Sequence, residues 1–230
     1  MESGDSMIED KRVRIIIGHY GSGKTEFSIN YAVKLARNGR KVALADLDIV
    51  NLYFRSREKK ELLKKEGIKV ISSSIEASAV DIPAVSPEVY GPFQDESYDY
   101  IIDVGGDHVG ARALGRYYKY LEEDKYDMFY VLNANRPETE TADKAIEYFK
   151  KIEDNARAKI TGIVNNTHML KSTTVEDVLK GQKLAQEVSN KLDIPIKYIS
   201  TLENVAKELP KNMEGEIFPI KLYMRENWML

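Results

Sequence analysis

The sequence contains no cysteine. This absence excludes disulfide bonds, thiol catalysis, thiolate metal sites and cysteine-ligated iron–sulfur clusters. It fits the reducing cytoplasm, which is the location we expect for the protein. The sequence also has no apolar run that approaches the roughly 20 residues needed to cross a bilayer. The first residues, MESGDSMIEDKR, are polar and acidic, so they do not form a signal peptide, and we expect residues 1–11 to be disordered.

An excess of basic residues is missing as well. The chain has 34 Lys and Arg against 37 Asp and Glu, a formal net charge of −3. Nucleic-acid binding requires a basic surface, so this balance argues against nucleic acid as the main partner. The basic stretch RSREKKELLKKEG interleaves glutamates with lysines at helical spacing, which favours a solvated helix face over a DNA-binding patch.

The C-terminal stretch GEIFPIKLYMRENWML is apolar and aromatic. It is short and contains a proline, so we expect a packed terminal strand or a partner contact and not a membrane-binding helix. The sequence therefore makes no strong case for either a membrane or a nucleic acid.

Short β-branched runs alternate with longer helix-periodic stretches along the whole chain. The candidate strands are RVRIIIG, KVALAD, IKVIS, YDYIIDVGG, YDMFYVLNA, AKITGIVNN and IPIKYIS, and the candidate helices lie near 24–38, 55–66, 110–121, 138–153 and 174–191. This alternation predicts one α/β domain over residues 1–230: a doubly wound, mostly parallel sheet of about seven strands with helices on both faces. Segment 72–97 is less regular, and we expect a long connection there, with a mobile lid as the alternative.

The stretch GHYGSGKT, Gly18 to Thr25, matches the phosphate-binding motif G-x-x-x-x-G-K-[ST] between a predicted strand and a predicted helix. Glycines let successive backbone N–H groups converge on phosphates, and the helix adds its positive N-terminal end. Lys24 is expected to reach the β- and γ-phosphates and to act in catalysis, and the Thr25 hydroxyl to ligate Mg²⁺. The alternative, a chance glycine-rich turn, is rarely flanked in this way. The predicted nucleotide contacts are Gly18, His19, Tyr20, Gly21, Ser22, Gly23, Lys24, Thr25 and Glu26.

Carboxylates follow two of the predicted strands. Asp46 and Asp48 come at the end of VALADLDIVN, and Asp103 ends YIIDVGGD. The carboxyl edge of an open parallel sheet is where ligands bind, and side-chain alternation sends Asp46 and Asp48 to the same side. A single carboxylate here could be a helix cap or a solvated loop residue. Three of them beside a phosphate loop predict a Mg²⁺ site that also includes Thr25.

The order of these motifs resembles the MinD/ParA group of P-loop ATPases, and DLDIVN…YFRSRE resembles a branch of CobQ/CobB/MinD/ParA-type nucleotide-binding proteins. The resemblance implies that Asp48 orients or activates the attacking water. It also implies that Asp46 and Asp103 help to hold Mg²⁺, directly or through its waters. Asn51 would lie in a first switch segment, and residues 105–107 would begin a second.

The predicted sixth strand ends in GIVNNTH. Guanine-specific P-loop proteins usually carry N-K-x-D here, and aligning Asn165 with the first position puts His168 where the aspartate belongs. In the group that the chain resembles, an asparagine at this strand end contacts adenine, so Asn165 or Asn166 is the candidate base contact. A simple loop-forming asparagine pair is the alternative. We therefore expect ATP and ADP as ligands.

The loop departs from the group that it resembles at two positions. His19 stands where that group has a lysine that reaches across a nucleotide-sandwich dimer, and Tyr20 replaces a glycine. An imidazole has neither the reach nor the fixed charge of a lysine, so we do not expect the same mechanism in trans, although dimerisation stays open. Four arginines in the predicted switch regions could supply the positive charge at the γ-phosphate that this lysine would provide: Arg55, Arg57, Arg112 and Arg116. We prefer Arg55 or Arg112 for this role. The alternative is that these arginines cover a solvated helix face.

Taken together, these features predict a Mg²⁺-dependent ATP-binding protein, a slow ATPase whose nucleotide state controls a protein partner or a homodimer. The alternatives are a small-molecule kinase or ATP-dependent ligase similar to dethiobiotin synthetase, and a nucleotide-binding module without hydrolysis. The absence of cysteine argues against a metal-insertion or iron–sulfur carrier role.

Overall fold

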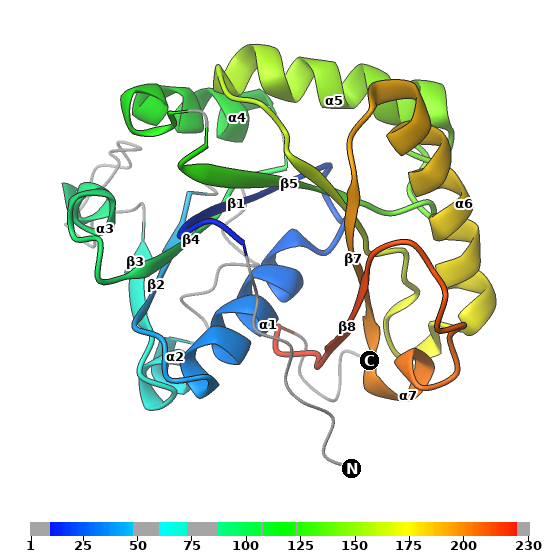
Figure 1. Cartoon of the computed structure of the whole chain (residues 1–230), viewed down its shortest axis with the longest axis horizontal. Coiled ribbons are helices and arrows are strands. Elements are labelled where there is room, and N and C mark those ends of the chain that lie inside the picture. The colour runs from blue at the N-terminus through cyan, green and yellow to red at the C-terminus, as the bar shows by residue number, and fades with distance from the viewer. Residues whose placement is uncertain (1–9, 48–59, 73–86, 107, 123, 225–230) are drawn as a thin grey trace, which may run out of the picture.

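A computed structural model describes residues 10–47, 60–72, 87–106, 108–122 and 124–224. Within them, all strands join one parallel sheet of eight strands in the order β3-β2-β4-β1-β5-β6-β7-β8 (Figure 1). The strands are β1 (Val13–Ile17), β2 (Val42–Asp46), β3 (Lys69–Ser72), β4 (Asp99–Asp103), β5 (Tyr126–Leu132), β6 (Gly162–Asn165), β7 (Ile196–Leu202) and β8 (Glu216–Ile220). The predicted parallel α/β fold is confirmed.

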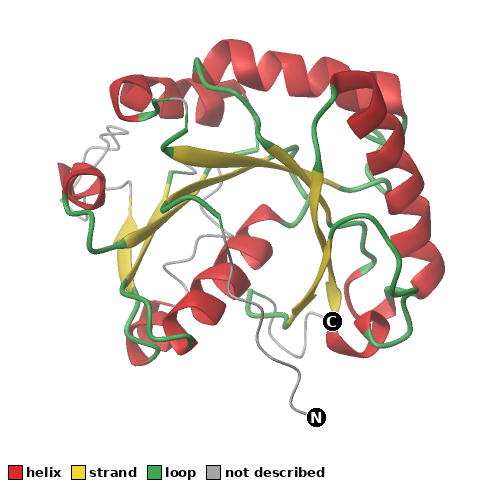
Figure 2. Cartoon of the chain, in the orientation of Figure 1, coloured by secondary structure: helices red, strands yellow, loops and turns green. Residues whose placement is uncertain are grey.

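Helices cover both faces of the sheet (Figure 2). The α-helices are α1 (Lys24–Arg37), α2 (Lys60–Lys65), α3 (Gly91–Gln94), α4 (His108–Leu114), α5 (Ala142–Ala156), α6 (Val175–Leu192) and α7 (Glu203–Ala206), and the 3₁₀ helices are η2 (Pro87–Tyr90), η3 (Gly115–Tyr120) and η4 (Leu170–Ser172). One apolar core joins α4, α5 and α6 to the sheet, and the other joins α1 and α2 to its opposite face. Strands β1, β2, β4, β5 and β6 are buried along their whole length because helices cover both faces, which explains their continuous apolar sequences.

Two elements differ in detail from the sequence expectation. The helix expected over 110–121 is α4 followed by η3, and a side chain at Gly115 would lie 2.8 Å from the carbonyl oxygen of Asn155 at the end of α5. This close approach occurs where the α-helix changes to a tighter helix. Part of the C-terminal stretch forms the edge strand β8, which pairs with β7 and tolerates Pro219 because its other edge pairs with no strand of the described residues.

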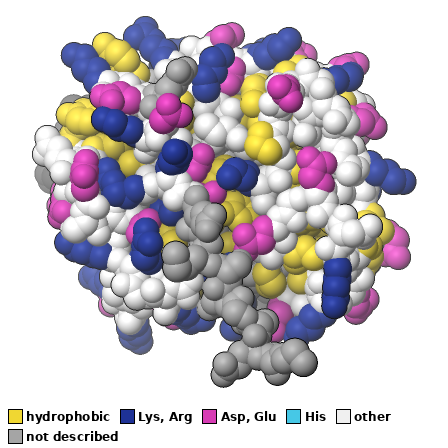
Figure 3. All heavy atoms as spheres, viewed as in Figure 1, with side chains coloured by type: hydrophobic (Ala, Val, Ile, Leu, Met, Phe, Trp, Pro, Cys, Tyr) yellow, Lys and Arg dark blue, Asp and Glu magenta, His cyan; other side chains and the backbone are white. Residues whose placement is uncertain are grey.

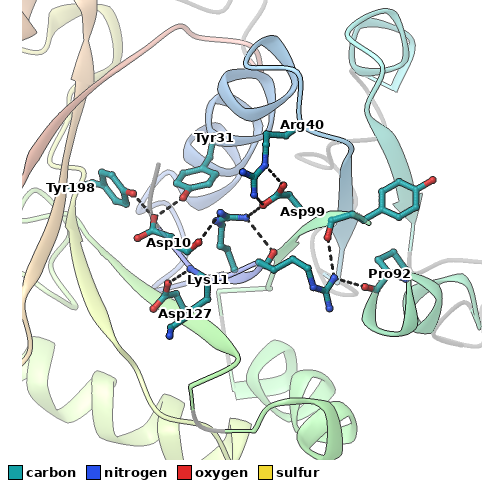
Figure 4. Close-up of polar contacts among 11 residues, drawn as sticks. Asp10, Lys11, Tyr31, Arg40, Pro92, Asp99, Asp127 and Tyr198 are labelled. Atoms are coloured by element: carbon teal, nitrogen blue, oxygen red, sulfur yellow. Dashed lines mark hydrogen bonds and ion pairs between the residues drawn. The ribbon is translucent and has the colours of Figure 1, made fainter. Parts of the chain in front are cut away.

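An ion cluster of Arg14, Asp99 and the half-exposed Arg40 lies near the amino ends of β1 and β4, whereas the phosphate loop follows the carboxyl end of β1. Figure 4 shows the polar contacts of this region. Arg14 on β1 is fully buried, and its Nη1 donates to Asp99 Oδ1 at 2.5 Å. Arg40 Nε donates to the other carboxylate oxygen of Asp99 at 2.6 Å. Burial alone works to raise the pKa of Asp99, but hydrogen bonds from Arg40 and Arg14 outweigh it, so the pKa lies below its ordinary value. Asp99 is therefore ionised and joins β1 to β4.

Asp10 and Lys11 lie at the end of the segment that we expected to be disordered, and both make hydrogen bonds across the fold. The Asp10 carboxylate accepts hydrogen bonds from the hydroxyl groups of Tyr31, at 2.5 Å, and Tyr198. The Lys11 N–H donates to Asp127 at 2.7 Å. These contacts join the residues before β1 to α1, β5 and β7.

On the face shown in Figure 3, basic and acidic side chains are interspersed, as the balanced composition predicts. Across the described ranges, none of the helices combines the length and the apolar character needed to span a membrane.

Candidate functional site

The phosphate-binding motif forms the turn between β1 and α1, at the carboxyl edge of the sheet. Gly21 and Gly23 have φ angles of 73° and 85°, a left-handed conformation that glycine adopts without steric cost. Gly23 is the N-cap of α1, and a side chain there would lie 2.2 Å from Asn166 Nδ2. The motif therefore has the strand–turn–helix context that phosphate binding requires.

Side chains that follow β5 and β6 bind carbonyl oxygens of this turn. Asn166 Nδ2 donates to the carbonyl oxygen of Ser22 at 2.7 Å, and Arg136 Nε donates to that of Gly21 at 2.9 Å. In a trans peptide the N–H points opposite to the C=O, so the bond from Asn166 turns the N–H of Gly23 away from β6. These bonds fix the loop conformation without using its inward N–H groups.

Lys24 is buried beneath the loop, and its Nζ donates to the carbonyl oxygen of His19 at 3.2 Å. Gly106, in the predicted second switch segment, lies against the phosphate loop and Lys24. A side chain at Gly106 would come within 2.6 Å of the Tyr20 nitrogen and 2.7 Å of Lys24 Nζ. The structure thus brings Gly106, in the segment predicted to be the second switch, into contact with the loop.

Asp46 and Asp103 end β2 and β4 and are each 2% exposed. They are partners in the parallel register, so their side chains share the face of the sheet that α1 covers. Ser28, one turn into α1, donates from Oγ to Asp103 Oδ1 at 3.1 Å. These carboxylates therefore lie beneath the first turn of α1, where Thr25 is located.

This donor set fits Mg²⁺, which prefers oxygen ligands and is usually held by one or two carboxylates, water and substrate phosphates. Thr25, Asp46 and Asp103 supply only oxygen atoms. The described residues contain no group of three or more acidic or histidine side chains able to hold a metal without such help. Asp48 and Asn51 lie outside the described residues, as do Arg55, Arg57 and Asp107.

A cavity of about 310 Å³ extends from the phosphate loop to the C-terminal segment. Beyond the loop and the start of α1, its walls combine apolar and polar side chains in equal number; the lining residues are Tyr20, Gly21, Gly23, Lys24, Thr25, Glu26, Arg136, Asn166, His168, Leu170, Thr173, Thr201, Leu202, Ile220, Leu222 and Met224. Asn166 Oδ1 and Thr201 Oγ1 are buried and accept or donate no hydrogen bond within the described protein. A cavity that combines apolar walls with polar atoms is typical of a site for a small organic ligand.

Only one of the two candidate asparagines lines this cavity. Asn165 Nδ2 donates to Val178 O and Gln182 Oε1, both at 3.1 Å, so its amide faces α6. Successive strand residues point to opposite faces, which is why Asn166 faces the loop instead. Since Asn166 contacts the loop, aligning it with the first position of N-K-x-D moves the aspartate position from His168 to Met169.

His19 packs within its own chain. Its Nδ1–H donates to the carbonyl oxygen of Tyr20 at 2.8 Å, and its ring lies edge-on against Tyr148 of α5, with centroids 5.0 Å apart. Tyr148 in turn donates from its hydroxyl to Gly106 O at 2.5 Å. The tyrosine therefore bridges the phosphate loop and the second switch segment.

Two parts of the site were not predicted from the sequence. The first is Arg136, in the turn NANRP after β5; Arg112 and Arg116, which we had considered, are exposed and do not line the cavity. Arg136 could have been found from its position at the carboxyl edge of the sheet, after the strand that lies beside β1. The second is the segment after β8, where Leu222 and Met224 close the cavity.

Glu26 holds this C-terminal segment in place, since its carboxylate accepts the backbone N–H groups of Tyr223 and, at 3.1 Å, Met224. Asn30, one turn later, exchanges two hydrogen bonds of 2.8 Å with the backbone of Lys221. The predicted nucleotide contact Glu26 thus lines the cavity and also fastens its far wall to α1.

Comparison with known structures shows the same fold in FtsY proteins. Cell division protein FtsY of Thermotoga maritima matches with 23% identity and a TM-score of 0.55, over 83% of this chain and 62% of that chain. FtsY of Mycoplasma mycoides matches with 18% identity and a TM-score of 0.54, over 80% and 58%. FtsY of Elizabethkingia anophelis, solved in complex with GDP, matches with 18% identity and a TM-score of 0.50, over 82% and 56%. The chain thus spans about three fifths of these FtsY chains.

A comparison with curated proteins gives no match. The family described as the CobQ/CobB/MinD/ParA nucleotide binding domain matches residues 15–212, a span that begins in β1 and includes the phosphate loop, both buried aspartates and Asn166. The chain therefore belongs to the CobQ/CobB/MinD/ParA nucleotide-binding domain family.

Proposed function

We propose that the protein is a Mg²⁺-dependent ATPase whose nucleotide state controls a partner, either another protein or a second copy of this chain. The observation that carries this proposal is that the cavity beside the phosphate loop is also lined by Asn166 and Thr201, whose Oδ1 and Oγ1 atoms form no hydrogen bond within the described residues. A nucleotide has the matching arrangement, with phosphates at one end and a flat base with polar edges at the other.

The polar atoms of the cavity favour adenine. Asn166 Nδ2 is committed to the carbonyl oxygen of Ser22, which leaves Oδ1 as an acceptor for the exocyclic amino group of adenine. Guanine presents donors at this edge that are best met by a carboxylate, and Met169 at the corresponding position is apolar and 54% exposed. GTP is the second candidate, because the FtsY fold is known with GDP bound.

The phosphate end of the site supports hydrolysis. Lys24 would contact the phosphates, and Thr25, Asp46 and Asp103 would hold Mg²⁺, which neutralises phosphate charge when bound. We assign the orientation of the attacking water to Asp48, by resemblance to the family. Gly106, which lies against Lys24 and Tyr20, would respond to an added γ-phosphate and so begin the switch.

The decisive experiment measures nucleotide affinity and phosphate release on the same preparations. Wild type is expected to bind ATP more tightly than GTP and to release phosphate slowly, only with Mg²⁺. Lys24→Ala should lose affinity for phosphates, and Asp48→Asn should bind ATP but release phosphate at least tenfold more slowly. The exposed Arg37→Ala, at the far end of α1, is the control.

Other outcomes would favour the alternative functions. Turnover that requires an acceptor from cell extract would indicate a kinase or ligase, and binding without any phosphate release would indicate a binding module. Preference for GTP would contradict the assignment of Asn166. Size exclusion with light scattering in Mg·ATP and Mg·ADP, on wild type and Asp48→Asn, tests whether the switch dimerises.

A further inference from the structure

A fixed positive charge lies at the rim of the cavity with no described carboxylate to balance it. Arg136 is half-buried, lines the cavity beside the phosphate loop, and forms no ion pair with any carboxylate in the part of the chain that the structure describes. A guanidinium carries five N–H donors, and among the described residues only Nε, bonded to Gly21 O, is used. The N–H groups of Nη1 and Nη2 are therefore available to a ligand.

The guanidinium lies directly across the phosphate loop. A side chain at Gly21 would come within 2.8 Å of Arg136 Cζ, 2.9 Å of Nε and 3.0 Å of Nη2. The glycine at this position thus serves two purposes, because its φ of 73° favours glycine and its missing side chain leaves room for the arginine. The planar, delocalised guanidinium suits phosphate oxygens, which it can bind through two parallel hydrogen bonds.

The turn that carries Arg136 is rigidly built. The backbone N–H of Arg136 donates to Asn133 O at 3.2 Å, and the carbonyl oxygen of Arg136 accepts from Thr139 N at 3.0 Å. The Thr139 hydroxyl donates to Asn133 O at 2.9 Å, and Asn135 is bound to Asp177 of α6. Arg136 is therefore positioned before any ligand arrives, which lowers the entropic cost of using it.

We propose that Arg136 is a phosphate-binding residue of this site, which contributes a second fixed positive charge beside Lys24 from within the same chain. This inference rests on the proposed nucleotide binding. It also explains how the site can function with a histidine at position 19, where the MinD/ParA group has a lysine. In this chain the positive charge would come from the turn after β5 and not from the phosphate loop itself. Arg112 is exposed and does not line the cavity, whereas Arg55 lies outside the described residues and stays a prediction.

The test compares Arg136→Ala, Arg136→Gln and Arg136→Lys with the control Arg37→Ala, by displacement of a fluorescent ADP analogue. Competitors are adenosine, AMP, ADP and ATP, with the guanine series in parallel. Loss of a charged hydrogen bond to phosphate should weaken ADP and ATP binding about tenfold to hundredfold. Adenosine binding should change less than threefold. Thermal unfolding of each variant verifies that it is folded.

The glutamine and lysine variants separate phosphate binding from loop support. Gln can still donate to Gly21 O but has no charge, so it should behave like Ala, whereas Lys should recover part of the ADP and ATP affinity. Recovery by Gln and not by Lys would overturn the proposal, as would wild-type affinity in Arg136→Ala or an equal loss for adenosine and ATP. A wild-type protein that binds no nucleotide would instead contradict the proposed function itself, and this inference with it.

Discussion

At the scale of single residues, the charge of Asp99 is predicted to stabilise the fold. Asp99→Asn removes the carboxylate that pairs with the fully buried Arg14, and leaving a buried charge unpaired costs about 3–5 kcal/mol. The effect should depend on pH. Because the folded-state pKa of Asp99 is below the unfolded value of about 3.9, its stabilisation is present above that value and is lost as the pH falls through the folded pKa.

Urea unfolding of wild type and Asp99→Asn from pH 7 to pH 3 measures this. The difference in free energy of unfolding should stay constant down to about pH 5 and narrow below about pH 4. Asp143→Asn is the matched control, since its exposed pair with Lys191 is screened by solvent and should have little effect on stability. Equal stability of Asp99→Asn and wild type at pH 7 would show that the ion cluster does not stabilise the fold.

Single residues of the site could be predicted where the local sequence fixes their position, and not where a distant part of the fold does. Lys24, Thr25 and Gly23 were predictable because a local motif fixes their spacing, and Asp46 and Asp103 because they end apolar strands. Asn165 and Asn166 could not be separated, since a shift of one residue at a strand end reverses the face. Arg136 is brought to the loop by the pairing of β5 with β1, a contact between residues distant in sequence.

At the scale of elements, apolar runs predicted seven strands, and five of these, β1, β2, β4, β5 and β6, are buried along their whole length. The sequence analysis left the C-terminal stretch open between a strand and a partner contact, because a short segment with a proline fits either. It gave no indication that the residues after β8 would close the cavity. That arrangement depends on Glu26 and Asn30, which lie almost 200 residues earlier.

The C-terminal segment should therefore control nucleotide affinity. Asn30 does not line the cavity, yet its side chain exchanges two hydrogen bonds with Lys221. We expect Asn30→Ala to weaken nucleotide binding about threefold to tenfold, since the wall formed by Leu222 and Met224 loses its anchor. Fluorescent ADP titration measures the affinity, and limited proteolysis should show faster cleavage near the C-terminus.

Asn155→Ala is the matched control for this change. Asn155 makes the same kind of bond within its helix, to the carbonyl oxygen four residues earlier, as Asn30 makes to Glu26, but it lies at the C-terminal end of α5 and does not line the cavity. Unchanged affinity in Asn30→Ala would mean that the C-terminal segment only packs against α1.

At the scale of the whole molecule, the strand order explains why the site has contributions from so many segments. β1 lies between β4 and β5, so its carboxyl end meets Asp103 and Gly106 on one side and Arg136 on the other. β2 and β6 lie one strand further out and add Asp46 and Asn166. The ion cluster of Arg14, Asp99 and Arg40 fixes the opposite ends of β1 and β4, which leaves the carboxyl edge for ligands.

A ligand that contacts this many segments should stabilise the entire fold. At a concentration of about 100 times Kd, a ligand that binds only the folded state adds about 2.7 kcal/mol, which for a chain of this size raises Tm by roughly 5–10 °C. We expect this rise with Mg·ADP in thermal unfolding of wild type, a smaller rise when EDTA removes the metal, and a much smaller one in Lys24→Ala at the same ligand concentration. An equal rise in wild type and Lys24→Ala would place the nucleotide away from the loop. A rise unaffected by EDTA would show that Thr25, Asp46 and Asp103 hold no metal that matters for binding.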